Sequence, residues 1–361
     1  MKKILLSTSA IVGVGLLASP TMAAERIKLA VGGYMEQYVG YAKAKRSNTA
    51  SFDLPKWDIQ PDTEVYFTGS TKLDNGITLS VVVELEGGES SGAASLDESY
   101  LRIVSPTLGE LRLGGDDAVD GQMNVQANRG ISGDYDNWIV EGSALTKNDN
   151  LYDNAAGDVN KISYFTPKIA GFQVGMSFAN TTVASEVDPP NYVTATVGGP
   201  SWASAVTYET KVGDVDVKLG ATASRLSNSK VTTGRRNYGG GAQLGYMGFS
   251  LSGGYAMTET NQNTTNSTVD NLDGTRFQLG LQYVTGPYTV GVWHMSDTHE
   301  GITSVAADDV TKVYSAYGEY AVSDGVKLQG LVFKVDYKDE TAANGNQPGG
   351  WGVVTGFRLD F

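Results

Sequence analysis

The chain has 361 residues, a formal net charge of -13, no cysteine, 45 glycines and 19 tyrosines. The lack of cysteine excludes a disulfide-stapled secreted domain and a lipid-anchored lipoprotein, and the acidic balance argues against nucleic acid as a partner. Beyond the N-terminus no apolar run approaches the ~18 residues of a membrane-spanning helix, so only alternating strands could cross a bilayer.

The first 24 residues have the pattern of a bacterial export signal. Lys2 and Lys3 form a basic start, residues 4–18 are mostly apolar, and Ala23 and Ala24 offer small side chains for cleavage. The alternative is an uncleaved anchor, which needs an apolar run of about 20 residues, longer than this one. We therefore expect a signal peptide at 1–24 and one mature domain at 25–361.

The first alternating segment covers residues 27–41. It places Ile27 and Leu29 on one face and Lys28 and Tyr34 on the other, which predicts a strand with an apolar side and a polar side. After a polar stretch, segments 64–72 and 77–86 follow, joined through Asn75-Gly76. Both residues of that pair tolerate the positive φ of a tight hairpin, so the two segments are expected to pair.

The next pair, residues 98–104 and 110–114, flanks a short turn and carries Arg102 and Arg112 on its polar face. The alternation then stops from Asp116 to Asp158. It resumes in nine further segments: 160–166, 172–180, 201–210, 215–224, 238–246, 249–257, 275–284, 288–295 and 312–322. Two more, 326–337 and 351–361, complete the chain. A change of apolar face near Gly330 predicts a bulge in the first of these two.

These segments predict an all-β fold, a transmembrane antiparallel β-barrel of about sixteen strands. Seven short turns alternate with eight long loops, and both termini fall on the short-turn side. We expect the short turns on the periplasmic side and the long loops outside the cell. A secreted β-sandwich or solenoid is the alternative, but neither sorts its connections in this way and no fixed repeat is present.

The chain resembles the trimeric outer-membrane porins of Gram-negative bacteria, in their alphaproteobacterial branch. The resemblance rests on the motifs Leu108-Gly-Glu-Leu-Arg-Leu-Gly-Gly115, Asn160-Lys-Ile-Ser-Tyr-Phe-Thr-Pro167 and Ala170-Gly-Phe-Gln-Val-Gly175, and the similarity runs over the whole mature chain. The resemblance implies a homotrimer in the outer membrane, in contact with lipid and lipopolysaccharide. Gly356, Leu359 and Phe361 resemble the C-terminal signal read by the barrel-assembly machinery, although Val354 departs from its expected polar residue.

The resemblance also implies that the third long loop, residues 116–158, folds inward and narrows the pore. This loop is acidic, and we expect the constriction to carry Asp116, Asp117, Asp120, Asp134, Asp136 and Glu141. Across the pore the family places basic side chains on the wall; here the candidates are Arg102, Arg112, Lys28, Lys43 and Lys72. Opposed charged rows in a narrow pore orient polar solutes and set ion preference.

Signs of catalysis and of metal binding are weak. The two histidines, His294 and His299, match no compact zinc site, and no nucleophile elbow occurs, so we do not expect an enzyme. We expect no cofactor, with one hypothesis left open: Asp116, Asp117 and Asp120 supply hard oxygen ligands close together, as calcium sites do, without a full calcium-loop motif.

The expected function is passive diffusion of small hydrophilic solutes and ions, with a preference for cations. A substrate-selective porin with a row of residues that binds a particular solute is one alternative. A barrel that serves chiefly as an adhesin or envelope anchor, working through its long loops, is the other.

Overall fold

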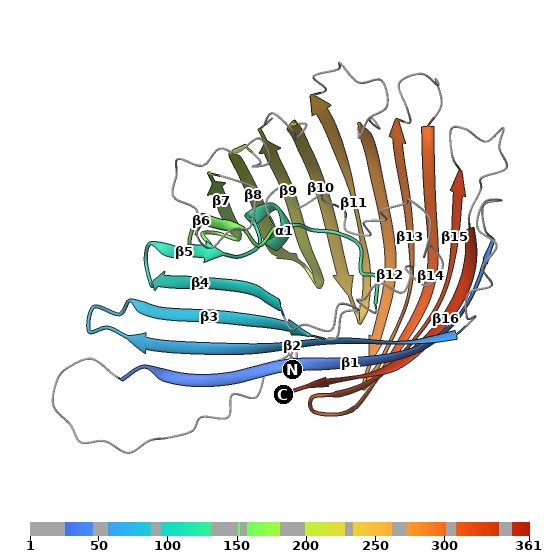
Figure 1. Cartoon of the computed structure of the whole chain (residues 1–361), viewed down its shortest axis with the longest axis horizontal. Helices are drawn as coiled ribbons and strands as arrows, with labels where there is room; N and C mark the ends of the chain where they lie inside the picture. Colours follow the sequence, from blue (N-terminus) through green and yellow to red (C-terminus); the bar gives the residue numbers. More distant parts are fainter. Residues whose placement is uncertain are drawn as a thin grey trace.

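The computed structural model describes residues 26–45, 57–87, 95–130, 151, 157–180, 199–227, 234–261, 273–300, 308–338 and 349–361. Within them sixteen strands form one closed antiparallel barrel in which each strand pairs with its neighbours in sequence and β1 pairs with β16 (Figure 1). The expected fold class is therefore confirmed. Expected signal residues 1–24 lie outside the described part.

The strands follow the predicted segments closely. Their bounds are β1 Lys28–Lys45, β2 Trp57–Lys72, β3 Thr78–Gly87, β4 Ser95–Ser105, β5 Gly109–Gly115, β6 Asn160–Phe165, β7 Phe172–Ala179, β8 Ser201–Val212, β9 Val215–Leu226, β10 Gly234–Tyr246, β11 Phe249–Asn261, β12 Gly274–Thr285, β13 Tyr288–Glu300, β14 Asp308–Ser323, β15 Val326–Lys338 and β16 Gly349–Asp360. One short helix, α1 Val119–Gln122, follows β5. Several strands extend further toward the long loops than predicted.

Alternation along the strands separates the two faces of the barrel. In β1, Leu29 is 73% exposed on the outside while Glu36 is fully buried inside. In β16 the outer positions hold Val353 and Phe357 and the inner ones Val354 and Gly356. The apolar stripe predicted for the first segment therefore lies outside, as hydrocarbon contact requires, and the last strand shows the same separation of faces.

Aromatic side chains of adjacent strands pair on the outer face near both ends. At the short-turn end Phe172 stacks on Tyr208 with ring centroids 4.3 Å apart, and Tyr288 on Tyr320 at 5.1 Å. Near the long-loop end Tyr41 lies 5.8 Å from Trp351. Such belts mark the two interfaces of a membrane around a transmembrane barrel.

No helix within the described residues is both long enough and apolar enough to span a membrane.

The prediction of a bulge near Gly330 was wrong. β15 keeps a continuous register with both neighbours through Gly330, and the irregularity lies instead between Ala321 and Ser323 of β14. The apolar residues that suggested a change of face, Leu331 and Phe333, point inward. They pack with Trp293, Met295, Val313, Val335 and Val354 in a buried apolar cluster on the inner wall.

Candidate functional site

The chain turns into the barrel directly after β5. Residues 116–130 run inside the ring of strands, and α1 lies beside β7, β8 and β9, away from β1 to β3 (Figure 1). This inner segment, residues 116–130, is called the inner loop below. The inward fold expected for the third long loop is thus seen in its described part.

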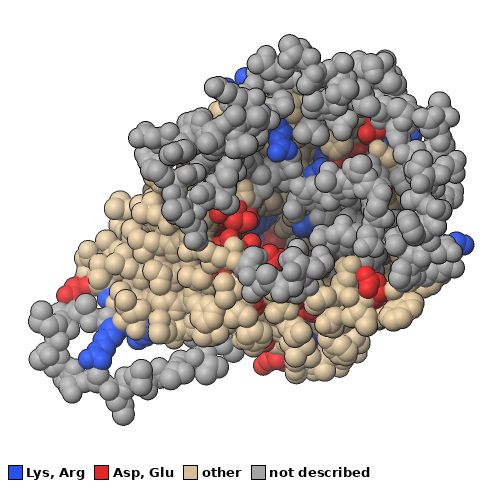
Figure 2. Space-filling model, in the orientation of Figure 1, with Lys and Arg blue, Asp and Glu red and all other residues tan. Residues whose placement is uncertain are grey.

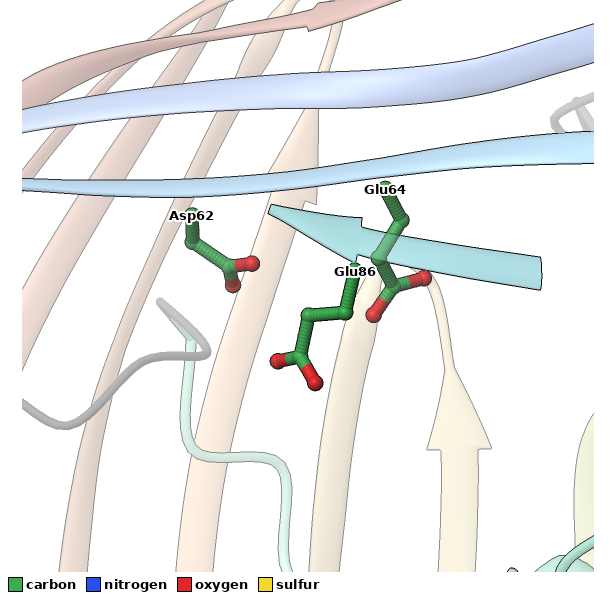
Figure 3. A group of neighbouring side chains, drawn as sticks. All are labelled: Asp62, Glu64 and Glu86. Carbon is green, nitrogen blue, oxygen red and sulfur yellow. The ribbon is translucent and has the colours of Figure 1, made fainter. Parts of the chain in front are cut away.

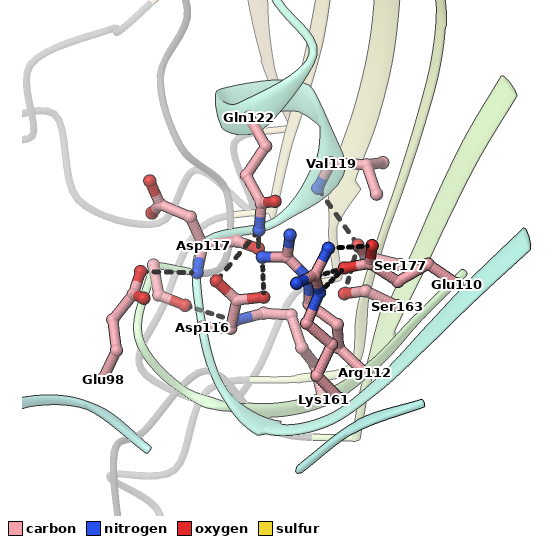
Figure 4. A network of polar contacts seen from close by, with 12 residues as sticks. Glu98, Glu110, Arg112, Asp116, Asp117, Val119, Gln122, Lys161, Ser163 and Ser177 are labelled. Carbon is pink, nitrogen blue, oxygen red and sulfur yellow. Dashed lines mark hydrogen bonds and ion pairs between the residues drawn. The ribbon is translucent and has the colours of Figure 1, made fainter. Parts of the chain in front are cut away.

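Arg112 anchors the root of the inner loop to the wall (Figure 4). Its Nε donates to Glu110 Oε1 at 2.6 Å, and its Nη1 donates to Asp116 Oδ2 at 2.9 Å. The guanidinium also lies over the rings of Tyr100 and Phe165, at 5.2 and 5.0 Å from their centroids. A planar, permanently charged fork suits this position because it satisfies two carboxylates and stacks at the same time.

Three further contacts fix the direction of the loop as it leaves β5 (Figure 4). Gln122 Nε2 donates to Asp116 Oδ1 at 3.0 Å, so both oxygens of that buried carboxylate accept hydrogen bonds. The backbone N–H of Asp117 donates to Glu98 Oε1 at 3.4 Å. The N–H of Val119 donates to Ser177 Oγ at 3.0 Å, which ties α1 to β7.

Beyond α1 the loop lies on a row of inward-facing glycines. A Cβ at Gly220 of β9 would stand 2.5 Å from Val125 Cγ2, and one at Gly241 of β10 would overlap the Val125 carbonyl oxygen. On β12 a Cβ at Gly280 would stand 2.6 Å from Asn128 O. The loop backbone can approach this wall so closely only because these positions lack side chains. We call Gly220, Gly241 and Gly280 the glycine row.

Hydrogen bonds hold the loop on this row. The N–H of Asn128 donates to Ser252 Oγ at 2.8 Å, and its side-chain amide donates to Ser250 Oγ at 3.0 Å. Gln243 Nε2 donates to Gln126 O at 3.0 Å. Beyond its root, which contacts Glu98 of β4, the inner loop is therefore fastened to β7–β12 on one side of the barrel. The opposite wall, β1–β3, faces the open space.

That opposite wall is acidic. Asp62 and Glu64 of β2 and Glu86 of β3 point into the same space, and their carboxylate oxygens lie within 4.8 Å of one another (Figure 3). Tyr34 OH donates to Asp62 Oδ1 at 3.1 Å and to Glu64 Oε1 at 2.8 Å. Figure 2 shows Asp and Glu side chains, together with Lys and Arg side chains, around the hollow at the middle of the molecule. We call Asp62, Glu64 and Glu86 the acidic wall.

The basic residues predicted for the wall lie in three different places. Arg102 and Arg112 are cross-strand partners on the inner face, and both bind Glu110, as Arg102 Nε lies 2.7 Å from its Oε1. Lys28 and Lys72 lie at the short-turn ends of β1 and β2. Lys43 is in register with the outward Trp351, so on the alternation of β1 it faces outward. The prediction of a pore-wall role for Lys43 was therefore wrong.

The acidic residues predicted for the loop are only partly described. Asp116 and Asp120 are buried, and Asp117 follows Asp116 at the loop root. Asp134, Asp136 and Glu141 lie outside the described residues. The three aspartates considered for calcium are not gathered into a group: within the described ranges the acidic trio with closely spaced oxygens is the acidic wall.

The charged residues of the acidic wall were not among the predicted site residues. Asp62, Glu64 and Glu86 sit on polar faces of strands where any lumen charge would fit, so no local pattern distinguished them. Lys161, also missed, is buried and donates to Gly157 O at 2.6 Å at the far end of the long loop. The sequence signal that could have pointed to Lys161 was its position directly after the acidic stretch.

The proposed assembly residues lie at the end of β16. Phe361 N and O pair with Gly33 O and N of β1, each at 3.0 Å. Leu359 faces outward, and Gly356 faces inward, where a Cβ would overlap Tyr38 and the backbone of Gln37. The last residue thus takes part in barrel closure.

Comparison with known proteins gives a consistent result. A protein-family model described as Gram-negative porin matches residues 7–341. Among solved structures, an anion-selective porin from Comamonas acidovorans is similar with a TM-score of 0.66 and 18% identity, covering 94% of this chain and 100% of that chain. A loop L8 deletion mutant of OmpT, an outer membrane protein of Vibrio cholerae, is similar with a TM-score of 0.64 and 12% identity, covering 94% of this chain and 100% of that chain. A mutant of Rh. blastica porin is similar with a TM-score of 0.57 and 13% identity, covering 92% of this chain and 100% of that chain. A search of curated proteins by sequence found no match.

Proposed function

Because the chain belongs to the Gram-negative porin family, we propose that it is a passive outer-membrane channel for small hydrophilic solutes and ions that favours cations. The observation that carries the cation preference is the acidic wall. Three carboxylates of β2 and β3 with oxygens within 4.8 Å of one another face the space beside the inner loop. A solute that passes the loop passes this wall.

Three inward-facing arginines of β4, β5 and β16 offset the wall only in part, because each is already paired. Arg102 and Arg112 share Glu110, and Arg112 also binds Asp116. Arg358 binds Glu36 and Asp360. An ion pair has little field at a distance, whereas neighbouring carboxylates of one sign raise the local concentration of cations. A narrow pore with walls of low dielectric strengthens this effect.

The remaining assignments follow from the family and are part of the proposal. Residues 1–24 act as a cleaved export signal, and residues 25–361 form one barrel domain that assembles as a homotrimer. The barrel-assembly machinery inserts the chain, and its outer face contacts lipid and lipopolysaccharide. The match to the Gram-negative porin family supports a channel rather than an enzyme.

The test is ion selectivity in planar bilayers. We expect the combined variant Asp62→Asn, Glu64→Gln and Glu86→Gln to shift the reversal potential in a potassium chloride gradient toward anions. The matched control is Asp74→Asn, Asp214→Asn and Asp324→Asn, which removes the same charge from exposed short turns. The control should leave the reversal potential nearly unchanged. Equal shifts in both variants would contradict a role for the acidic wall.

A further inference from the structure

A polar cavity of about 460 Å³ lies between the inner loop and the inner wall of β10–β15. Its volume is in the range of roughly 300–1,000 Å³ that holds small-molecule ligands. Gln243 and Gln282 of its lining stand close to the turns that end β10 and β12. The cavity therefore lies on the short-turn side of the loop, where a solute arrives after passing the constriction.

The lining is rich in carboxamides and nearly neutral. Six side-chain amides line it: Asn124, Gln126, Asn128, Gln243, Gln282 and Gln329. The charged residues of the lining are one arginine, Arg129, and one glutamate, Glu319. This composition contrasts with the acidic wall, in a chain whose net charge is -13. Attraction of ions into the pore does not explain a cluster of uncharged hydrogen-bonding groups.

The polar groups of the cavity are held in place. The ring of Tyr317 lies between Gly130 of the inner loop and Gly291 of β13, where a Cβ at either glycine would overlap it. Its OH donates to Gln282 Oε1 at 3.0 Å, which fixes the orientation of that amide. Gln329 is fixed in the same way, because it accepts from Tyr38 OH at 2.9 Å and donates to Glu319 Oε2 at 3.0 Å.

This orientation leaves both donors and acceptors for a ligand. The amide group of Gln282 has its oxygen bound to Tyr317, and its NH₂ has no bonded partner among the described residues. Gln243 has the opposite arrangement, since its NH₂ is bound to Gln126 O and its oxygen has no partner within the same residues. The hydroxyl groups of a ligand can accept from the first and donate to the second, whereas an ion can interact favourably with only one of the two.

We propose that this cavity binds a neutral polyhydroxylated solute the size of a monosaccharide or disaccharide. The inference rests on the proposed channel function, because the solute reaches the cavity through the pore. Carboxamides that are already held in place lose little conformational entropy when they bind hydroxyl groups, so the cavity can retain a solute weakly but specifically. The cavity would thus slow and select neutral solutes after the acidic wall has acted on ions.

The test uses sucrose as the probe and two separate readouts. Sucrose should block single-channel current of the wild-type trimer saturably, and calorimetry in detergent should show binding without any need for conduction. The double variant Gln243→Met and Gln282→Met keeps side-chain length but removes both polar groups, and we expect sucrose binding to weaken at least tenfold. Gln173→Met, an inward glutamine of β7 outside the cavity, is the control and should bind sucrose as wild type does.

The outcomes separate the two proposals. Channels that conduct with cation preference but neither bind nor are blocked by sucrose would overturn the cavity assignment and leave the channel function intact. Equal weakening by Gln173→Met and by the double variant would also overturn it. Sucrose binding by calorimetry in a protein that does not conduct would support the cavity and contradict the channel. If the double variant does not fold, the wild-type binding measurement decides alone.

Discussion

Glu36 and Arg358 form an ion pair across the seam where the first and last strands of the barrel meet. Arg358 Nη1 lies 2.6 Å from Glu36 Oε1, and the two residues are register partners of β1 and β16. Tyr38 OH donates to the other Glu36 oxygen at 2.7 Å, and the Arg358 guanidinium lies 4.0 Å above the ring of Tyr34. The glutamate is fully buried, so its hydrogen bonds come from these protein groups.

We expect Glu36→Ala to destabilise the closed barrel strongly. Breaking a buried ion pair costs about 3–5 kcal/mol, and because Arg358 keeps its second ion pair with Asp360, we expect a loss at the lower end of that range. The measurement is the urea midpoint of unfolding in detergent. The control is Asp336→Ala, which breaks the exposed Lys334–Asp336 pair of similar length, 2.6 Å. Exposed pairs contribute little, so a midpoint shift for Asp336→Ala as large as that for Glu36→Ala would contradict the argument.

The glycine row gives a prediction about pore width. A Cβ at Gly241 would overlap the Val125 carbonyl oxygen, so Gly241→Ala must move the inner loop off the wall and toward the pore axis. We expect lower single-channel conductance with the barrel still folded. Gly245→Ala is the matched control on the same strand and face, because its Cβ would meet Asp216 Cβ at an ordinary 3.5 Å. Unchanged conductance in Gly241→Ala would show that the loop does not rest there.

The two arginines that share Glu110 should behave differently. Arg112→Gln removes both ion pairs at the root of the inner loop, with Glu110 and with Asp116. We therefore expect larger fluctuations of the open-channel current, because the loop loses its anchor on β5. Arg102→Gln leaves Arg112 in place on Glu110 and Asp116, so its current noise should stay near the wild-type level. Noise spectra from single channels at constant voltage compare the two.

The parts of the structure that the sequence predicted are those set by local periodicity. A strand in this environment alternates lipid-facing and lumen-facing residues, so segments such as 351–361 reveal both their length and their faces. Turn residues such as Asn75-Gly76 mark the hairpins for the same local reason. The inward course of residues 116–130 was predicted only by the resemblance to the porin family.

The parts that the sequence did not predict depend on contacts between distant segments. Gly220 and Gly241 come into contact with Val125 only when the loop folds across β9 and β10. The prediction of a bulge near Gly330 was wrong for a related reason. Leu331 and Phe333 looked like lipid-facing residues that had changed sides, whereas they pack inward against Trp293 and Met295. A strict apolar-out pattern does not hold where the lumen contains its own apolar cluster.

The separation of faces can be tested at two adjacent residues of β3. Val81 is 50% exposed on the outer face, and Val82 points inward opposite Thr68 and Tyr100. Val81→Lys places a charge in hydrocarbon near the middle of the strand, which costs about 2–4 kcal/mol in barrels of this kind. Val82→Lys places the same charge in the water-filled lumen and should fold nearly as well as wild type. Urea titrations of folding into lipid vesicles measure both, and a larger loss for Val82→Lys than for Val81→Lys would mean that the two faces are assigned the wrong way round.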